Sequence, residues 1–198
     1  MLSRQKIRNE MREQRRSLTS QQQDVAARAI QRQLIRMPAF RQAKRIACYL
    51  ANDGEIDLSV VIAQIRLMKK QCYLPVLAPL GPRRLWFAPL SRCSRMCVNR
   101  FGIPEPMMSA RDYASASELD LILLPLVAFD GSGNRLGMGG GFYDRTLAYL
   151  NRRDHWKKPQ LLGVAHDLQR VDSLDSASWD IPLNGIITDQ RVYQVSRC

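Results

Sequence analysis

The sequence predicts an α/β protein: a single domain of three layers, α/β/α, with a largely parallel central sheet. Short apolar runs alternate with segments of helical spacing, residues 119–129 are apolar almost throughout, and a glycine-rich loop follows them. The 198 residues, 45% of them hydrophobic, suffice for one core and are few for two. No repeat or linker divides the chain, so residues 1–198 are expected to form one domain.

The N-terminal part of the chain is expected to begin with two helices. Residues 3–17 have helical spacing, and Ser3 is the expected N-cap. Ser20 and Gln23 match a capping box, which predicts the start of a second helix. That helix must end before Pro38, because the residue before a proline disfavours helical geometry.

Strands and helices then alternate. Residues 45–51 predict the first strand, residues 52–54 a turn, and Asp57 is expected to cap a third helix. Pro75 indicates an end or a bulge in its strand, because proline cannot donate to a sheet ladder. The remaining strands are expected at 72–77, 85–88, 119–129, 161–165 and 185–189.

The composition is that of a globular protein that attracts anions. The net charge is +12, which favours a nucleotide, a polyglutamylated small molecule or a nucleic acid as partner. No apolar run approaches the ~18 residues of a membrane span, and the N-terminus lacks a secretory signal. We therefore expect a cytoplasmic protein with no membrane partner. Five irregularly spaced cysteines argue against a disulfide framework.

The glycine-rich loop suits phosphate groups. Four glycines stand between Gly137 and Gly141, so several backbone N–H groups can point into one concavity. A helix is expected directly after the loop, and its N-terminus would add positive charge. Arg135 and Arg145 flank the loop, and Asp144 could hold a Mg²⁺ ion on bound phosphates. The alternative is a glycine-rich turn without a ligand.

This loop matches neither of the common phosphate-binding motifs. A Walker A loop needs Gly-Lys-Ser/Thr after its glycines, and that sequence is missing. A dinucleotide fingerprint needs a third glycine where Phe142 stands. A nicotinamide oxidoreductase is therefore a weak alternative.

Two further features could belong to a binding site. Arg4, Arg8, Arg12 and Arg16 lie along one stripe of the first helix, either as a solvated basic face or with Arg4 and Arg8 reaching an anionic ligand. Glu55 follows the first strand, where open α/β sheets place ligands, although it could be ordinary loop charge.

Four segments together resemble the 5-formyltetrahydrofolate cyclo-ligase family. NRLGMGGGFYDR at 134–145, after an apolar strand, is similar to the family signature. The Arg4-x-x-x-Arg8 pair matches an N-terminal pattern in which lysine is the commoner first residue. Glu55-Ile56 and the extended segment 101–106, FGIPEP, fit two more family positions. Near the end, Trp179-Asp180 stands where the family has His-Asp, so that histidine's role does not carry over.

The resemblance implies ATP- and Mg²⁺-dependent conversion of 5-formyltetrahydrofolate to 5,10-methenyltetrahydrofolate, with release of ADP and phosphate. It implies catalytic roles for Arg135 and Glu55, and Mg²⁺ ligation by Asp144 and Asp180. The ATP-binding residues it implies are Arg4, Arg8, Arg135, Gly137, Met138, Gly139, Gly140, Gly141, Phe142 and Tyr143. The folate-binding residues it implies are Leu50, Glu55, Phe101, Phe142 and Tyr143. Plain core packing is the alternative for the apolar ones.

Two points concern partners. Surplus basic residues could favour folates with polyglutamate tails, among them Arg152, Arg153, Lys157 and Lys158. A nucleic-acid-binding module is the main rival from another class, because of the charge and the arginine stripe. No recognised nucleic-acid motif is present, and a glycine loop ending in aspartate would have no task there.

Overall fold

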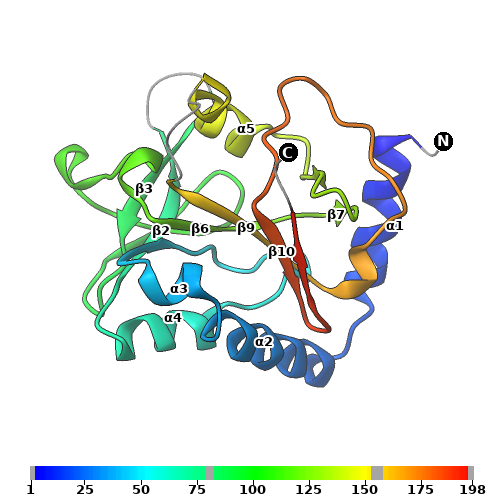
Figure 1. The fold of residues 1–198 in the computed structure, drawn as a ribbon. Coiled ribbons are helices and arrows are strands. Elements are labelled where there is room, and N and C mark those ends of the chain that lie inside the picture. Colours follow the sequence, from blue (N-terminus) through cyan, green and yellow to red (C-terminus); the bar gives the residue numbers. More distant parts are fainter. Residues whose placement is uncertain (1–2, 79–82, 153–157, 196–198) are drawn as a thin grey trace.

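The computed structural model describes residues 3–78, 83–152 and 158–195, and it has a seven-stranded mixed sheet at its centre (Figure 1). The five inner strands are parallel, and the two edge strands are antiparallel to their neighbours. From edge to edge the strands are β11 (Val192–Gln194), β10 (Gly185–Thr188), β9 (Gln160–Ala165), β6 (Leu121–Pro125), β1 (Arg45–Ala47), β2 (Gln71–Leu77) and β3 (Leu85–Pro89). The α/β prediction is confirmed.

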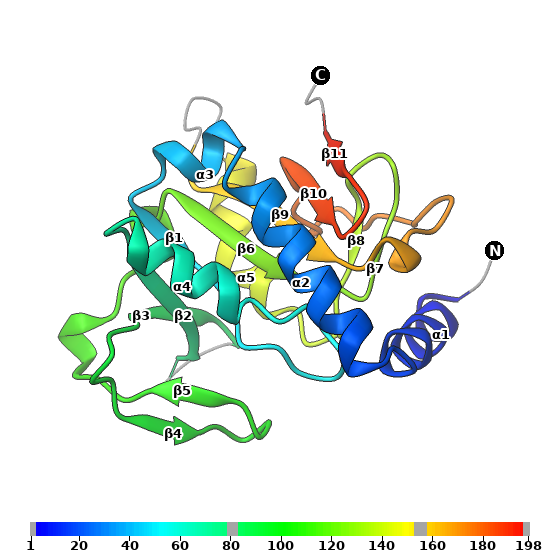
Figure 2. The same ribbon diagram turned by 90° about the horizontal axis from the view of Figure 1, so that it is seen from below.

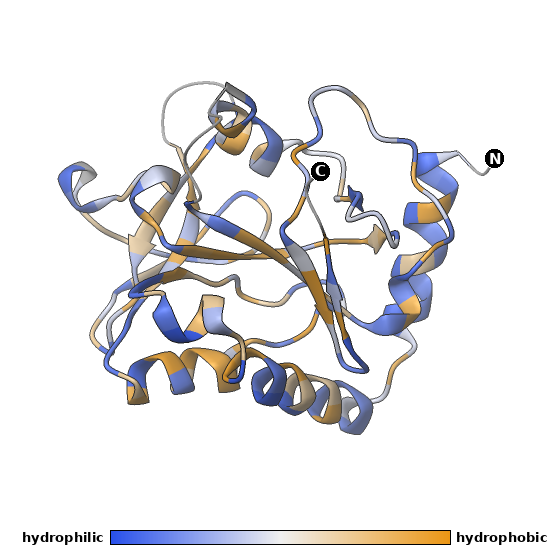
Figure 3. Ribbon diagram, viewed as in Figure 1, coloured by the Kyte–Doolittle hydropathy of each residue, from blue (hydrophilic) through white to orange (hydrophobic). Residues whose placement is uncertain are grey.

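Helices lie on both faces of this sheet. One face is covered by α2 (Ser20–Leu34), α3 (Pro38–Gln42) and α4 (Ser59–Leu67), which Figure 2 shows from below. The short α5 (Phe142–Leu147) and the 3₁₀ turn η3 (Ala148–Arg152) lie on the other face. The first helix, α1 (Arg4–Arg16), stands beside the sheet near the glycine-rich loop, and Figure 3 shows that it is mostly hydrophilic.

The central strand β6 faces a core on each side. Leu121 and Leu123 pack into the cluster that includes α2 and α4. Ile122 and Leu124 point the other way, into the cluster that includes Leu147 of α5. Successive side chains of a strand alternate between faces, so a strand buried on both faces has no polar positions. This explains the unbroken apolar run in the sequence.

The apolar run 119–129 is nevertheless not one strand. After β6 the chain leaves the sheet and forms β7 (Ala128–Phe129), which pairs with β8 (Arg135–Leu136) in a small hairpin. Gln169 causes part of this break, because its Nε2 donates to the carbonyls of Leu126 and Val127 at 2.8 and 2.9 Å. Side chains from other segments thus satisfy the backbone that a strand would have paired. The loop–helix order that follows is as predicted.

Helix starts agree with the sequence in part. The Ser3 cap of α1 is confirmed, with Oγ accepting from the Lys6 N–H at 3.3 Å. The capping box of α2 lies one residue earlier than expected, on Thr19 and Gln22. Asp57 accepts from the Ser59 N–H at 2.9 Å, but the N-cap position of α4 is Leu58.

Pro75 does not end or bulge its strand, so that expectation was wrong. β2 continues through it and stays in register with β3, Pro75 opposite Phe87. The pairing of β1 with β2 stops at Ala47 opposite Tyr73. The missing N–H of Pro75 therefore falls beyond the end of β1, where no ladder bond is lost.

The remaining elements are a second small hairpin and three 3₁₀ turns. The hairpin β4 (Met96–Val98) and β5 (Pro104–Pro106) is tied to β2, because Glu105 accepts from the Leu77 N–H at 3.0 Å (Figure 2). Three short 3₁₀ turns complete the fold: η1 (Ala110–Asp112), η2 (Ala116–Glu118) and η4 (Asp167–Gln169). Within the described ranges, no helix is both long and apolar enough to cross a membrane.

Candidate functional site

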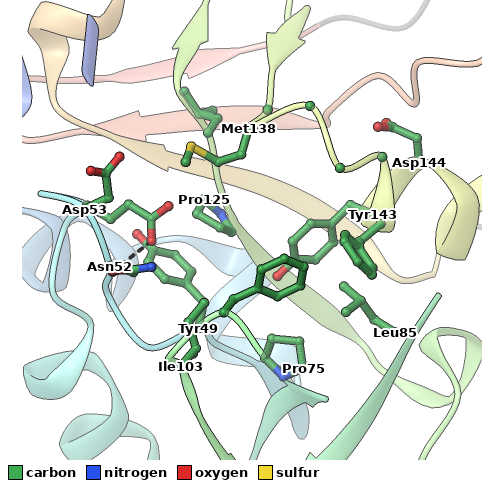
Figure 4. A pocket seen from close by; sticks show the side chains of 18 of the residues that line it. Tyr49, Asn52, Asp53, Pro75, Leu85, Ile103, Pro125, Met138, Tyr143 and Asp144 are labelled. Atoms are coloured by element: carbon green, nitrogen blue, oxygen red, sulfur yellow. Dashed lines mark hydrogen bonds between the residues drawn. The ribbon is translucent and has the colours of Figure 1, made fainter. Parts of the chain in front are cut away.

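A cavity of about 740 Å³ opens where β1, β2 and β6 end (Figure 4). Its wall comes from α1, the segment after β1, the β4–β5 hairpin, the glycine-rich loop and the chain before β10. It is lined by every catalytic, ATP-binding, folate-binding and metal-binding residue that the resemblance implies: Arg4, Arg8, Leu50, Glu55, Phe101, Arg135, Gly137, Met138, Gly139, Gly140, Gly141, Phe142, Tyr143, Asp144 and Asp180. The fold therefore brings all of them together, while their individual roles stay predictions.

The glycine-rich loop needs its glycines. Gly139 has φ +95° and Gly141 has φ +63°, in the left-handed region that disfavours side chains. A Cβ on Gly140 would lie 2.8 Å from the ring of Phe142. Arg8 Nε donates to the Gly137 carbonyl at 2.9 Å, which ties α1 to the start of the loop. The loop is thus attached to α1, and its glycines contribute no side-chain atoms to the cavity wall.

Two arginine–aspartate pairs stand side by side at this end of the cavity. Arg135 Nη2 contacts Asp144 Oδ1 at 2.5 Å, and Arg4 reaches Asp180 Oδ2 at 3.2 Å through both Nη atoms. The Ile181 N–H, next to Asp180, lies 3.5 Å from Asp144 Oδ1, which brings the pairs together. Arg135 is buried, and its Nε has no partner among the described residues. A buried guanidinium N–H without a partner indicates a missing acceptor.

The other arginines near the glycine-rich loop differ in whether they line the cavity. Burial and the charge of Arg4 lower the pKa of Arg8, an effect that Asp180 partly offsets. Arg145, expected to flank the loop with fixed charge for a bound phosphate, donates to the Gly140 carbonyl and does not line the cavity. It supports the loop and is not a ligand-facing group.

The carboxylates of Asp144 and Asp180 fit a Mg²⁺ ion that arrives on phosphates. In the part of the chain that the structure describes, no group of three or more His, Cys, Asp or Glu could hold a metal ion. Mg²⁺ is typically held by one or two carboxylates plus substrate phosphates. Each of these aspartates pairs with its arginine through one oxygen, Oδ1 of Asp144 and Oδ2 of Asp180. The donor set therefore suits a metal–nucleotide complex.

Glu55 lines the cavity from the turn of Asn52 and Asp53, which Figure 4 shows on the opposite side of the cavity from Asp144. Its Oε2 accepts from the Asn52 N–H at 3.1 Å. Burial raises the pKa of Glu55 to about 7, although the positive charge of Arg15 and the Asn52 hydrogen bond oppose the shift. The carboxyl group thus exchanges a proton near neutral pH, as a proton acceptor requires.

Two tyrosines share the surroundings of Glu55. Burial, followed by the charge of Glu55, raises the pKa of both Tyr49 and Tyr143, which keeps their hydroxyls protonated. The Tyr49 hydroxyl is buried and has no hydrogen-bond partner among the described residues. The sequence analysis did not single out Tyr49 as a site residue, because a tyrosine in a segment with a strand pattern is usually a core residue.

The turn that carries Glu55 is clamped by three arginines of α1. Asp53 has φ +55° and accepts hydrogen bonds from Arg12, Arg15 and Arg16. Burial alone would raise the pKa of Asp53, but these bonds outweigh it and lower the pKa to about 2. Of the four arginines in the stripe, Arg12 and Arg16 therefore hold this turn, and Arg4 and Arg8 line the cavity.

Arg15 was missed by the sequence analysis, although a signal was present. It lies four residues after Met11 and eight after Ile7, so it continues the apolar edge of α1 instead of the basic stripe. A charge on a buried helix face needs a partner of opposite charge. Asp53, directly after the first strand, was the available candidate.

Aromatic rings close the mouth of the cavity. Phe101 and Phe142 meet edge to face with ring centres 5.8 Å apart, and Arg100 lies 5.1 Å from the centre of the Phe101 ring. Phe101 remains 52% exposed, and Trp179 on the rim is 68% exposed. Both rings therefore offer free faces to a planar ligand.

Of the basic residues expected to favour polyglutamate tails, Lys158 does not line the cavity. Lys158 pairs with Asp120 at 2.6 Å, beyond the amino end of β6, whereas the cavity lies at its carboxyl end. Arg153 and Lys157 lie outside the described residues, as does the side chain of Arg152.

Comparison with known proteins identifies the family of the chain. The profile described as "5-formyltetrahydrofolate cyclo-ligase family" matches residues 1–189. Proteins named 5-formyltetrahydrofolate cyclo-ligase from Escherichia coli K12 and Haemophilus influenzae are each 40% identical over 93% of this chain, which spans 99% and 96% of their lengths. The structure of a 5,10-methenyltetrahydrofolate synthetase from Aquifex aeolicus superposes with a TM-score of 0.81 at 27% identity, covering 100% of this chain and 95% of that one. The chain thus belongs to the 5-formyltetrahydrofolate cyclo-ligase family, and it is an enzyme of that family.

Proposed function

We propose that the chain converts 5-formyltetrahydrofolate to 5,10-methenyltetrahydrofolate, with ATP and Mg²⁺ consumed as a complex and ADP and phosphate released. One observation carries this proposal. A single cavity has an opened glycine loop with guanidinium groups at one end and a carboxyl group titrating near pH 7 at the other. Such an arrangement suits a phosphorylated anion on one side and a nitrogen that loses a proton on the other.

The loop end would hold the triphosphate. Arg4, Arg8 and Arg135 supply N–H groups for phosphate oxygens, and Arg135 Nε is already without a partner among the described residues. Phosphoryl transfer depends mainly on positioning and on charge neutralisation, which these groups provide. Asp144 and Asp180 would hold Mg²⁺, which would neutralise charge on the phosphate oxygens.

The Glu55 end would hold the folate. Its carboxylate would accept a hydrogen bond from N10–H of the substrate and orient that nitrogen toward the formyl carbon. Leu50, Phe101, Phe142 and Tyr143 would enclose the pterin and benzoyl rings, since they line the cavity between the two ends.

The reaction then needs two steps. First, the formyl oxygen attacks the γ-phosphorus, and the bond from that phosphorus to the bridging oxygen breaks to release ADP. Second, N10 attacks the activated formyl carbon and gives its proton to Glu55. The C–O bond breaks with its electron pair leaving on phosphate, and the resulting N5–C–N10 unit carries the positive charge of the product.

The direct test is the appearance of methenyltetrahydrofolate absorbance with pure protein. We expect product only when ATP and Mg²⁺ are both present, and no product with ADP. Thermal shift separates the alternatives, because binding raises apparent stability by RT ln(1 + [L]/Kd). A shift with NADPH or an oligonucleotide, and none with ATP–Mg²⁺ or 5-formyltetrahydrofolate, would contradict the proposal.

A further inference from the structure

Arg15 is the one fully buried charged side chain among the described residues, and it touches three segments that line the cavity. Its Nε donates to the Asp53 carbonyl at 2.7 Å, and its Nη2 contacts Asp53 Oδ2 at 2.8 Å. Its Nη1 donates to the Leu126 carbonyl, just past β6, at 3.2 Å. The same Nη2 lies 3.9 Å from Glu55 Oε1 and 3.9 Å from the sulfur of Met138.

These contacts join the two ends of the site. Asp53 and Glu55 belong to the folate-facing turn, Met138 belongs to the glycine-rich loop, and Leu126 stands between them at the end of the central strand. A planar guanidinium fixes several acceptors in one geometry, which an ammonium group cannot do. Arg15 itself does not line the cavity, so it touches no ligand directly.

The neighbouring arginines provide a natural comparison. Arg12 and Arg16 also bond to the Asp53 carboxylate, but among the described residues neither forms a hydrogen bond or ion pair with Leu126, Met138 or Glu55. Arg16 is half exposed, and Arg12 is about a third exposed. Removing either one therefore weakens the attachment of α1 to the turn without freeing the loop or Glu55.

We propose that Arg15 is a positioning residue that fixes Glu55 and the glycine-rich loop in one arrangement, so that N10 of the folate faces the carbon activated by ATP. The inference rests on the proposed role of Glu55. Displacement by about 1 Å at a reacting centre can lower a rate ~100-fold. Loss of Arg15 should accordingly act on the chemical step more than on binding.

The electrostatic surroundings of Glu55 provide a second readout. The charged and titratable groups around Glu55 and its turn are Asp53 beside it, Tyr49 after β1, Tyr143 from α5, His166, which hydrogen-bonds the backbone of Gly54, and the three arginines of α1 at the turn, Arg12, Arg15 and Arg16. Arg15 is the one cation in this set that lowers the pKa of Glu55. Without Arg15 the carboxyl group of Glu55 ionises at higher pH. The acid limb of the pH profile of kcat should therefore move to higher pH.

The test compares Arg15→Gln and Arg15→Lys with Arg12→Gln and Arg16→Gln, all assayed with ATP, Mg²⁺ and 5-formyltetrahydrofolate. For Arg15→Gln we expect kcat to fall by about 30- to 100-fold, KM for ATP to change by less than about 3-fold, and the acid limb to shift to higher pH. Arg15→Lys should lower kcat while leaving the limb in place, because it retains charge but not geometry. Arg12→Gln and Arg16→Gln should stay within about 3-fold of the parent in kcat.

Circular dichroism and thermal melting establish that each variant is folded. Equal kcat values for Arg15→Gln and Arg16→Gln, with the same pH profile, would overturn the inference. If Arg15→Gln does not fold, the test rests on Arg15→Lys. A kcat of Arg15→Lys equal to that of the parent would then refute the positioning role. Failure of both to fold also refutes it, because Arg15 would then act on stability alone.

A parallel Glu55→Gln variant keeps the two proposals apart. If Glu55→Gln retains the activity and the acid limb, the proposed role of Glu55 fails whatever Arg15 does. If Glu55→Gln is inactive while Arg15→Gln behaves like Arg16→Gln, only the inference about Arg15 fails.

Discussion

Arg135 is a buried guanidinium whose N–H groups are only partly satisfied by the described residues. Nη2 is paired with Asp144, whereas Nε has no partner among the described residues. Replacement by alanine removes a proposed phosphate ligand and leaves Asp144 without its counter-charge. We therefore predict that Arg135→Ala lowers kcat by ~100- to 1000-fold, the range for one electrostatic donor.

Steady-state kinetics with saturating ATP would measure this loss. Arg135→Lys should recover little, since a point charge cannot replace a planar fork. A suitable control is Arg45→Gln, because Arg45 pairs with Glu118 at 3.8 Å on the amino side of the sheet. Activity of Arg135→Ala within threefold of the parent would refute the assignment.

Glu55 has a pKa raised to about 7 from an ordinary 4.5, and this shift has a consequence for stability. Between these two values the folded protein holds a proton that the unfolded chain has lost. Stability therefore falls as the pH rises from about 4.5 to 7, and the loss is complete above the folded pKa. Glutamine carries no charge and can still accept from the Asn52 N–H.

We predict that Glu55→Gln is more stable than the parent at pH 8, by about 1–3 kcal/mol, and equally stable at pH 4. Urea unfolding at both pH values would measure the difference. The same variant should have lost most of its activity. A variant that is less stable at pH 8 would show that the ionised carboxylate is well satisfied in the fold.

At the scale of elements, the glycine-rich loop and α1 form one unit, because Arg8 binds the loop backbone and stands close to Gly139. A Cβ on Gly139 would lie 3.6 Å from Arg8 Cζ, at a residue whose φ is +95°. Gly102 in the β4–β5 hairpin also has positive φ, +76°, but a Cβ there would meet nothing within 4 Å.

We predict that Gly139→Ala and Gly102→Ala both lose about 1–2 kcal/mol, the cost of placing a side chain in left-handed geometry. Only Gly139→Ala should raise KM for ATP, by about 10-fold, because the displaced loop and Arg8 no longer present their N–H groups together. Thermal melts and ATP titrations separate the two effects. Equal KM values would mean that the loop does not contact the nucleotide.

The order of elements could be predicted because it depends on local patterns. The strand, glycine loop and helix were all recognisable between 119 and 147, although the strand proved to be two short ones. The break at Leu126 could not be predicted, because the groups that bond its carbonyl, Arg15 and Gln169, come from distant parts of the chain. The burial of Arg15 could be inferred from its place on the apolar edge of α1, but its contacts with Leu126 and Met138 could not, because they form only once the chain has folded.

At the scale of the whole molecule, the carboxyl ends and the amino ends of the parallel strands carry different features. The carboxyl ends carry the cavity, whereas at the amino ends Asp120 accepts from the Lys44 and Arg45 N–H groups and pairs with Lys158. The cavity became predictable because parallel strands place their following loops at one edge. The net charge of +12 is spread far more widely than this site.

This overall charge should act on substrates over a distance. Folates with polyglutamate tails carry more negative charge than the monoglutamate, so a strongly basic protein attracts them more. We predict a lower KM for a pentaglutamate form of 5-formyltetrahydrofolate than for the monoglutamate, with a difference that shrinks from 50 mM to about 500 mM salt as screening increases. Lys158→Gln should not alter the difference, because Lys158 is paired with Asp120 away from the cavity. Equal KM values at low salt would show that the charge of the protein does not reach the folate tail.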